Sequence, residues 1–143
     1  MPSSPEVLLD THVWVWMLEG LADRIGARVR RMVSYASRDG RLRVSPISAW
    51  EIGMLVSKDR LSFGEPCDQW VQRATSAPGL SVAELTPEIA VESSFLPGTF
   101  HGDPADRMLI ATARTRAATL LTADERILAY GRQGYVRAQD CRA

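Results

Sequence analysis

The chain has 143 residues, of which 17 are basic and 17 acidic, so its formal net charge is zero. This length, with 45% hydrophobic residues, predicts one domain over 1–143 with a buried core. Within it, the polar, proline-containing residues 1–5 are expected to form a flexible lead-in. Zero net charge neither indicates nor excludes a nucleic-acid partner, because such binding depends on local charge.

The two cysteines, Cys67 and Cys141, are far apart and lack the spacing of a structural zinc site. Two such distant cysteines are expected to be reduced thiols. The N-terminal residues MPSSPE lack the basic and apolar regions of a secretion signal. No apolar run approaches the roughly 20 residues of a membrane span. We therefore expect a cytoplasmic protein without a membrane partner.

Hydrophobic patterning predicts short apolar strands alternating with helices along the whole chain. The expected strands are 7–9, 42–44, 80–85, 119–121 and 135–136. The expected helices are 12–18, 24–37 after an Asp23 cap, 46–57 after a Ser45 cap, 67–74, 87–94, 104–117 after an Asp103 cap, and 123–130. This alternation predicts an α/β fold with a parallel sheet.

The stretch EVLLDTHVWVW places one carboxylate, Asp10, at the end of an apolar strand. A carboxylate at the exit of a buried strand needs a cation or hydrogen bonds. Parallel sheets bind ligands at the carboxyl ends of their strands. Asp10 is therefore either the cap of the next helix or part of a site.

Three more acidic residues are expected at the same edge of the sheet. Asp106 lies in the first turn of its helix, where a negative charge also interacts favourably with the helix dipole. Asp124 follows the 119–121 strand, where it could equally cap the next helix. Glu51 lies beside Ile47, Trp50, Met54 and Leu55, which we expect to form the apolar face of the 46–57 helix. A surface glutamate would lie on the face of the helix opposite these apolar residues. We therefore expect Glu51 to be partly buried and to face a cation.

Carboxylates crowded together repel one another unless a cation neutralises them. An all-oxygen ligand set of Asp10, Glu51, Asp106 and Asp124 favours Mg²⁺ or Mn²⁺ over Zn²⁺. The hydroxyls of Thr11, Ser48 and Thr122 either orient these carboxylates or serve as local caps. Such a site supports metal-assisted hydrolysis of a phosphodiester.

Arginines are concentrated at 20–43, a stretch that contains seven arginines and only two aspartates, Asp23 and Asp39. They form either a solvated helix surface or a phosphate-binding flank. Candidates for contact with phosphates are Arg28, Arg31, Arg107 and Arg116.

Four stretches together resemble the PIN domain, and within it the VapC-like toxins of type II toxin–antitoxin pairs. They are LLDTHVWVW at 8–16, SPISAWEIGML at 45–55, HGDPADRMLIATA at 101–113 and LLTAD at 120–124, and they span nearly the whole chain in the order and spacing of that family.

The resemblance implies a three-layer α/β/α PIN-like fold around a short parallel sheet, and a Mg²⁺- or Mn²⁺-dependent endoribonuclease. By position, Asp10, Glu51, Asp106 and Asp124 match its catalytic and metal-binding acids, and Asp103 is a secondary candidate within an HxDPxDR pattern. The resemblance also implies an RNA substrate, a homodimer, and a cognate antitoxin that covers the acidic pocket. The alternative function is a non-catalytic module whose acidic pocket binds RNA or a basic peptide.

Overall fold

A five-stranded parallel sheet forms the centre of the molecule in the computed structural model, which describes residues 4–143 except the side chain of Ala22. Its strands, in spatial order, are β3 (Leu80–Val82), β2 (Leu42–Val44), β1 (Val7–Leu9), β4 (Thr119–Thr122) and β5 (Ala138–Asp140). Every neighbouring pair is parallel, and Leu9 lies opposite Leu121 in the β1–β4 register.

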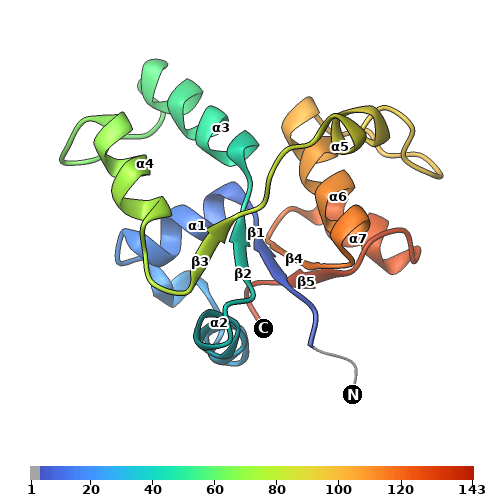
Figure 1. Ribbon diagram of the computed structural model, residues 1–143, viewed down its shortest axis with the longest axis horizontal. Helices are drawn as coiled ribbons and strands as arrows, with labels where there is room; N and C mark the ends of the chain where they lie inside the picture. Colours follow the sequence, from blue (N-terminus) through green and yellow to red (C-terminus); the bar gives the residue numbers. More distant parts are fainter. Residues whose placement is uncertain (1–3) are drawn as a thin grey trace.

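Seven α-helices and one 3₁₀ turn connect the strands among the described residues (Figure 1). They are α1 (Thr11–Leu18), the turn η1 (Ala22–Arg24), α2 (Ala27–Arg38), α3 (Pro46–Ser57), α4 (Cys67–Thr75), α5 (Pro87–Glu92), α6 (Pro104–Arg116) and α7 (Glu125–Arg132). Within residues 4–143, every helix is too short or too polar to cross a bilayer.

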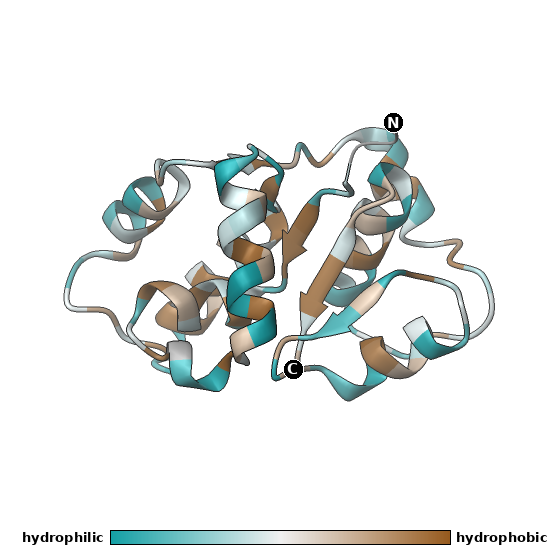
Figure 2. Ribbon diagram, turned by 90° about the horizontal axis from the view of Figure 1, so that it is seen from below, coloured by the Kyte–Doolittle hydropathy of each residue, from teal (hydrophilic) through white to brown (hydrophobic). Residues whose placement is uncertain are grey.

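Two hydrophobic clusters cover opposite faces of the sheet, because successive side chains of a strand point to opposite sides. Leu9 of β1 packs with residues of α1, α2 and α4, whereas Leu8 packs with residues of α5, α6 and α7. Apolar strands therefore lie between two helical layers, as Figure 2 shows by hydropathy. The predicted three-layer α/β/α fold is confirmed.

The sheet has its topological switch point between β1 and β4. The chain proceeds from β1 to β2 and β3 on one side, then crosses to β4 and β5 on the other. Connections leave these two strands in opposite directions, which opens a crevice at their carboxyl ends. Asp10 and Asp124 follow β1 and β4, so both lie at this crevice.

The predicted start of the second helix and the predicted last strand are wrong. Asp23 belongs to the turn η1, and α2 begins after Gly26, whose missing Cβ leaves room for the backbone of Ala143. The last strand is Ala138–Asp140 rather than 135–136. Val136 is buried in a cluster before the strand begins, while the strand itself is a polar edge without an apolar pattern.

The predicted apolar face of α3 is also wrong. Its fully buried residues are Ser48 and Ile52, and Trp50 is 56% exposed. Glu51 is nevertheless partly buried, as expected. The reason is that α3 lies across the edge of the sheet and contacts both clusters, Ile52 the first and Ile47 the second, so a single stripe does not describe its packing.

Candidate functional site

Asp10 is held rigidly at the carboxyl end of β1. One carboxylate oxygen accepts a hydrogen bond from the backbone N–H of Thr11 at 2.7 Å, and the other accepts from the Thr122 hydroxyl at 2.6 Å. Asp10 is thus the N-cap of α1, and it is only 8% exposed. The cap and the site are the same carboxylate, because the strand exit and the helix start coincide.

Asp106 lies in the first turn of α6, and the helix geometry fixes its position. The Asp103 carboxylate caps α6 by accepting from the backbone N–H of Asp106 at 2.9 Å, and Pro104 occupies the first turn. Asp106 is 7% exposed. The cap-then-proline pattern therefore presents Asp106 to the crevice and places Asp103 beside it.

Asp124 caps α7 through the backbone N–H groups of Arg126 and Ile127. The Thr122 hydroxyl, which donates to Asp10, also accepts from the backbone N–H of Asp124 at 2.9 Å. One threonine therefore links the carboxylates that follow β1 and β4.

Arg126 joins two of the acidic side chains. Its guanidinium nitrogen lies 3.0 Å from a carboxylate oxygen of Asp106 and 3.0 Å from one of Asp124. The sequence pattern did not indicate a role for Arg126. Its position two residues after Asp124 was visible, but nothing local indicated that it reaches Asp106 on another helix.

Glu51 enters the crevice from α3. Within residues 4–143 its carboxylate makes no hydrogen bond or ion pair, although the residue is partly buried. The helix that carries it is tied to the start of α1 by a hydrogen bond of 2.9 Å from the Thr11 hydroxyl to that of Ser48. Both hydroxyls are fully buried, so Thr11 and Ser48 fix the two elements that bear Asp10 and Glu51.

A cavity of about 360 Å³ collects these side chains. Its lining consists of all four predicted acids together with the secondary candidate and a few neighbours: Asp10, His12, Trp16, Glu51, Asp103, Asp106, Ala123, Asp124 and Arg126. We call this cavity the acidic pocket. Its five carboxylates come from four separate parts of the chain, since Asp103 and Asp106 share the start of α6, and Arg126 offsets part of their charge.

Burial and mutual repulsion change the protonation of the acidic pocket. Burial raises the pKa of Asp106 to about 7, with further increases from the charges of Asp103, Asp10 and Asp124 against the opposing effect of Arg126. Burial likewise raises the pKa of Asp10, against the hydrogen bonds from Thr122 and Thr11.

Asp124 behaves differently from the other two aspartates. Burial pushes its pKa upwards, but hydrogen bonds from the Arg126 side chain and from the start of α7 outweigh burial, so its pKa is lowered. An acidic pocket of this kind gains stability from a cation.

The donor chemistry of the acidic pocket fits a hard divalent cation, because all of its anionic donors are carboxylate oxygens. Within residues 4–143, however, no three potential ligands converge closely enough to hold an ion as they stand. The guanidinium of Arg126 lies between Asp106 and Asp124 instead. Binding of an ion therefore requires side-chain rotation, above all of Arg126.

The predicted phosphate-contact arginines differ in position. Arg28 and Arg31 are exposed on α2. Arg107 donates to the backbone carbonyls of Ser93 and Phe100, and Arg116 pairs with Glu6 at the amino end of β1. Arg107 and Arg116 are thus engaged by contacts within the chain, and contact of these four arginines with phosphates stays a prediction.

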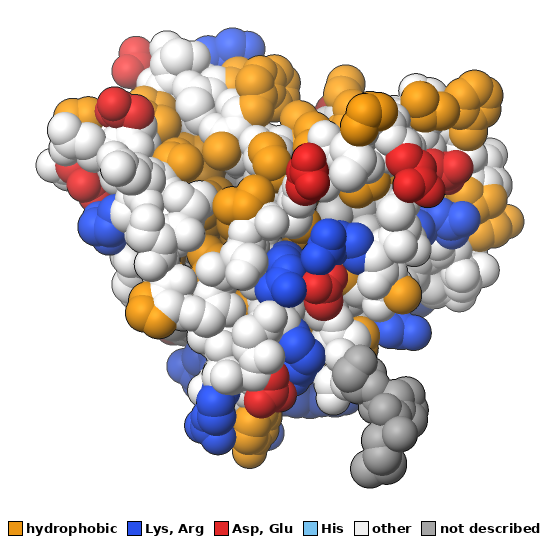
Figure 3. Space-filling model, in the orientation of Figure 1, with side chains coloured by type: hydrophobic (Ala, Val, Ile, Leu, Met, Phe, Trp, Pro, Cys, Tyr) orange, Lys and Arg blue, Asp and Glu red, His pale blue; other side chains and the backbone are white. Residues whose placement is uncertain are grey.

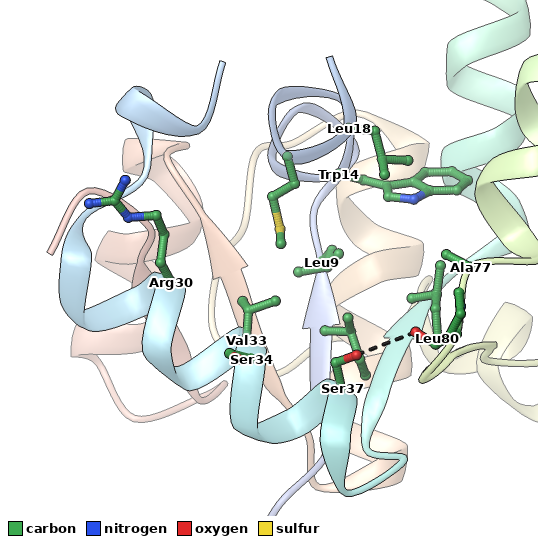
Figure 4. A pocket seen from close by; sticks show the side chains of 12 residues that line it. Leu9, Trp14, Leu18, Arg30, Val33, Ser34, Ser37, Ala77 and Leu80 are labelled. Atoms are coloured by element: carbon green, nitrogen blue, oxygen red, sulfur yellow. Dashed lines mark hydrogen bonds between the residues drawn. The ribbon is translucent and has the colours of Figure 1, made fainter. Parts of the chain in front are cut away.

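An apolar cavity of about 320 Å³ lies on the other side of α1 (Figure 4). Trp14 and Leu18 of α1 lie over Leu9 of β1, with Val33 of α2 and Leu80 of β3 closing the cavity. The indole Nε1–H of Trp14 is buried and has no acceptor within the described residues. No carboxylate lines this cavity, so it lacks the oxygen donors that the acidic pocket collects.

The chain matches a known protein family over most of its length. The family model described as PIN domain matches residues 7–133. The chain is 32% identical over 121 residues to ribonuclease VapC22 of Mycobacterium tuberculosis, an alignment that covers 85% of this chain and 88% of that protein.

Solved structures share the fold at lower identity. A chain of the DNA-bound VapBC structure from Salmonella typhimurium matches with a TM-score of 0.68 at 16% identity, covering 96% of this chain and 98% of that one. A chain of VapBC2 from Rickettsia felis, bound to a promoter DNA fragment, matches with a TM-score of 0.67 at 16% identity, covering 93% and 96%. The chain therefore belongs to the PIN domain family, in the branch that contains the VapC ribonucleases.

Proposed function

We propose that the protein is a metal-dependent endoribonuclease that hydrolyses RNA phosphodiester bonds and acts as the toxin of a toxin–antitoxin pair. The observation that carries this proposal is the convergence of Asp10, Glu51, Asp106 and Asp124, from four separate elements, on one pocket at the switch point of the sheet. Support comes from the 32% identity to a protein named as a ribonuclease.

Asp10, Glu51 and Asp106 would hold the principal Mg²⁺ or Mn²⁺ ion, and Asp124 would hold a second ion or position the attacking water. When bound, such an ion polarises the phosphoryl oxygen and lowers the pKa of bound water. The hydrogen bond from Thr122 orients Asp10 and favours its charged form, against the effect of burial. Asp103 supports Asp106 through the cap of α6 and is a secondary ligand candidate.

Arg126 has two roles in this proposal. Without an ion it offsets the charge of Asp106 and Asp124, both at 3.0 Å. Its side chain is 56% exposed, so it can rotate out of the acidic pocket at little cost. Once displaced, the guanidinium remains at the rim, where an RNA phosphate would arrive, and a planar guanidinium pairs well with phosphate.

The direct test is cleavage of structured RNA by the wild type with Mg²⁺, Mn²⁺ or EDTA, beside Asp10→Asn and Glu51→Gln. A matched control is Glu125→Gln, because Glu125 is an exposed neighbour of Asp124 that pairs with Arg132 outside the pocket. We expect cleavage only with an ion and only in the wild type and the control. Cleavage that survives EDTA or the double substitution would contradict a metal-dependent nuclease.

The second candidate is a non-catalytic module that binds RNA or a basic peptide. The observation that favours it is the guanidinium already seated between Asp106 and Asp124, since an arginine of a peptide would bind in the same way. Binding of RNA without cleavage, in the presence of Mn²⁺, would favour the module.

The proposed partners are a cognate antitoxin and a second copy of the chain, both met in the cytoplasm, where the free thiols of Cys67 and Cys141 would persist. The antitoxin would cover the acidic pocket and offer a cation to its carboxylates. Support for the homodimer is the hydrophobic surface that Figure 3 shows over α3, β3 and α5. Large hydrophobic side chains exposed on these three elements are Trp50 of α3, Val82 of β3 and Val91 of α5.

A further inference from the structure

The acidic pocket continues past Trp16 into a second hollow of about 460 Å³. The two share Trp16 and Ala123, and the second hollow is completed by Asp23, Arg24, Gly26 and Arg142. The two hollows are therefore neighbours that meet at Trp16, and we call them together the groove, with an acidic end and an end that carries two arginines.

Trp16 is turned towards this groove by its place on α1. Trp14, two residues earlier, is 1% exposed in the core, whereas Trp16 is only partly buried. It lies one helical turn after His12, which also lines the acidic pocket, and their ring centroids are 6.1 Å apart. Trp16 packs against the first cluster and also lines both hollows.

A cation already lies over the ring of Trp16. The guanidinium carbon of Arg24 is 5.3 Å from the Trp16 ring centroid, and Arg24 is exposed. Exposed cation–π pairs are weak, so Arg24 can exchange the ring for a stronger anionic partner. Of the charged residues in the second hollow, Arg24 and Arg142 outnumber Asp23, although Arg142 also pairs with Asp140.

We propose that Trp16 is a stacking platform for the base of a nucleotide next to the scissile phosphate, and that Arg24 and Arg142 bind the phosphate beyond it. This inference rests on the proposed ribonuclease function and deepens it. An aromatic ring beside a basic groove is the combination that binds single-stranded nucleic acids.

The substrate class follows from this arrangement. A base inside a duplex has both faces covered by its neighbours and cannot also stack on an indole ring. The nucleotide on Trp16 must therefore be unpaired, in a loop or a single strand. Because every base has a π-face, Trp16 selects unpaired structure rather than a particular base.

The test measures binding separately from cleavage. A fluorescein-labelled single-stranded RNA 12-mer, and the same strand in a duplex, are titrated by anisotropy against Asp10→Asn, in which cleavage is silenced. Trp16→Leu in this background should weaken binding of the single strand at least fivefold and leave the duplex unchanged, whereas Trp16→Tyr should retain most of the affinity. Arg24→Gln should reduce the salt slope of log K by about 0.7.

Tyr35→Leu is the matched control. Tyr35 is an exposed aromatic residue with the guanidinium of Arg38 5.5 Å from its ring, and it lines a different hollow with residues near the amino ends of β1 and β4. It reproduces the aromatic–arginine pair outside the groove. We expect its RNA affinity to equal that of the parent.

An abasic scan of the 12-mer locates the stacked nucleotide. One abasic position should weaken binding to the Trp16 protein but not to Trp16→Leu. If Trp16→Leu melts at a lower temperature than its parent, the scan on the Trp16 protein decides instead, and the absence of any sensitive position overturns the platform.

The stacking platform is also overturned if a folded Trp16→Leu protein binds the single strand as tightly as its parent, or if its affinity for the duplex falls by the same factor. In either case cleavage by the wild type would show that the ribonuclease proposal stands. A wild type that neither binds nor cleaves RNA with Mg²⁺ or Mn²⁺ would instead overturn both proposals.

Discussion

Replacing Asp106 by Asn should stabilise the metal-free protein at alkaline pH. Asp106 is 7% exposed, and burial raises its pKa from 3.8 to about 7. A carboxyl whose pKa is higher in the folded than in the unfolded state favours folding while it is protonated. That advantage is complete below about pH 4 and is lost as the pH rises to about 7.

The expected gain in stability follows from the shift in the pKa of Asp106. At about 1.4 kcal/mol per pKa unit, ionised Asp106 costs the folded state about 4 kcal/mol above pH 7. Asn keeps the shape without the charge, and the shift of the Asp106 pKa to about 7 already includes the opposing attraction of Arg126. At pH 8 in EDTA, the melting temperature of Asp106→Asn should therefore exceed that of the wild type by roughly 10 °C.

Thermal melts at pH 5 and pH 8, with EDTA or Mn²⁺, provide the assay. The gain should be much smaller at pH 5, where wild-type Asp106 is mostly protonated when folded. Mn²⁺ should stabilise the wild type more than the variant, because the variant lacks an anionic ligand.

Asp124→Asn is the control of opposite sign, because the pKa of Asp124 is lowered and its charge stabilises the fold above pH 4. A variant of Asp106 that melts below the wild type at pH 8, or the same pH dependence in both proteins, would refute the assignment of a costly buried charge.

Three further variants test other contacts. Thr122→Val removes the hydroxyl that donates to Asp10, so Mn²⁺ affinity measured by calorimetry at pH 7 should fall about tenfold; unchanged affinity would mean that the hydroxyl is only a turn residue. Arg126→Met removes the guanidinium that competes for Asp106, so Mn²⁺ affinity should rise several-fold, and a fall would contradict competition. Trp50→Glu places a charge on the exposed surface of α3 and should shift the sedimentation of a dimer to that of a monomer.

The sequence alone determined the features that depend on neighbours along the chain. The caps Ser45, Thr86 and Asp103, each followed by proline, set the starts of α3, α5 and α6, because a cap and a restricted φ act within one turn. The apolar strand before Asp10 predicted a buried parallel strand, and β1 is buried throughout. The order of strands and acids was therefore sufficient to anticipate one acidic edge.

Only the tertiary structure decided features that depend on distant segments. Trp14 is buried and Trp50 exposed, although both follow apolar patterns, because burial depends on what another element places opposite. The engagement of Arg107 by backbone carbonyls and of Arg116 by Glu6 likewise depends on segments far away in the sequence.

The reach of Arg126 from α7 to Asp106 on α6, and the groove through Trp16, likewise require helices that are apart in sequence to meet. Local hydrogen bonds are encoded residue by residue, whereas these contacts arise only when the sheet brings its helices together.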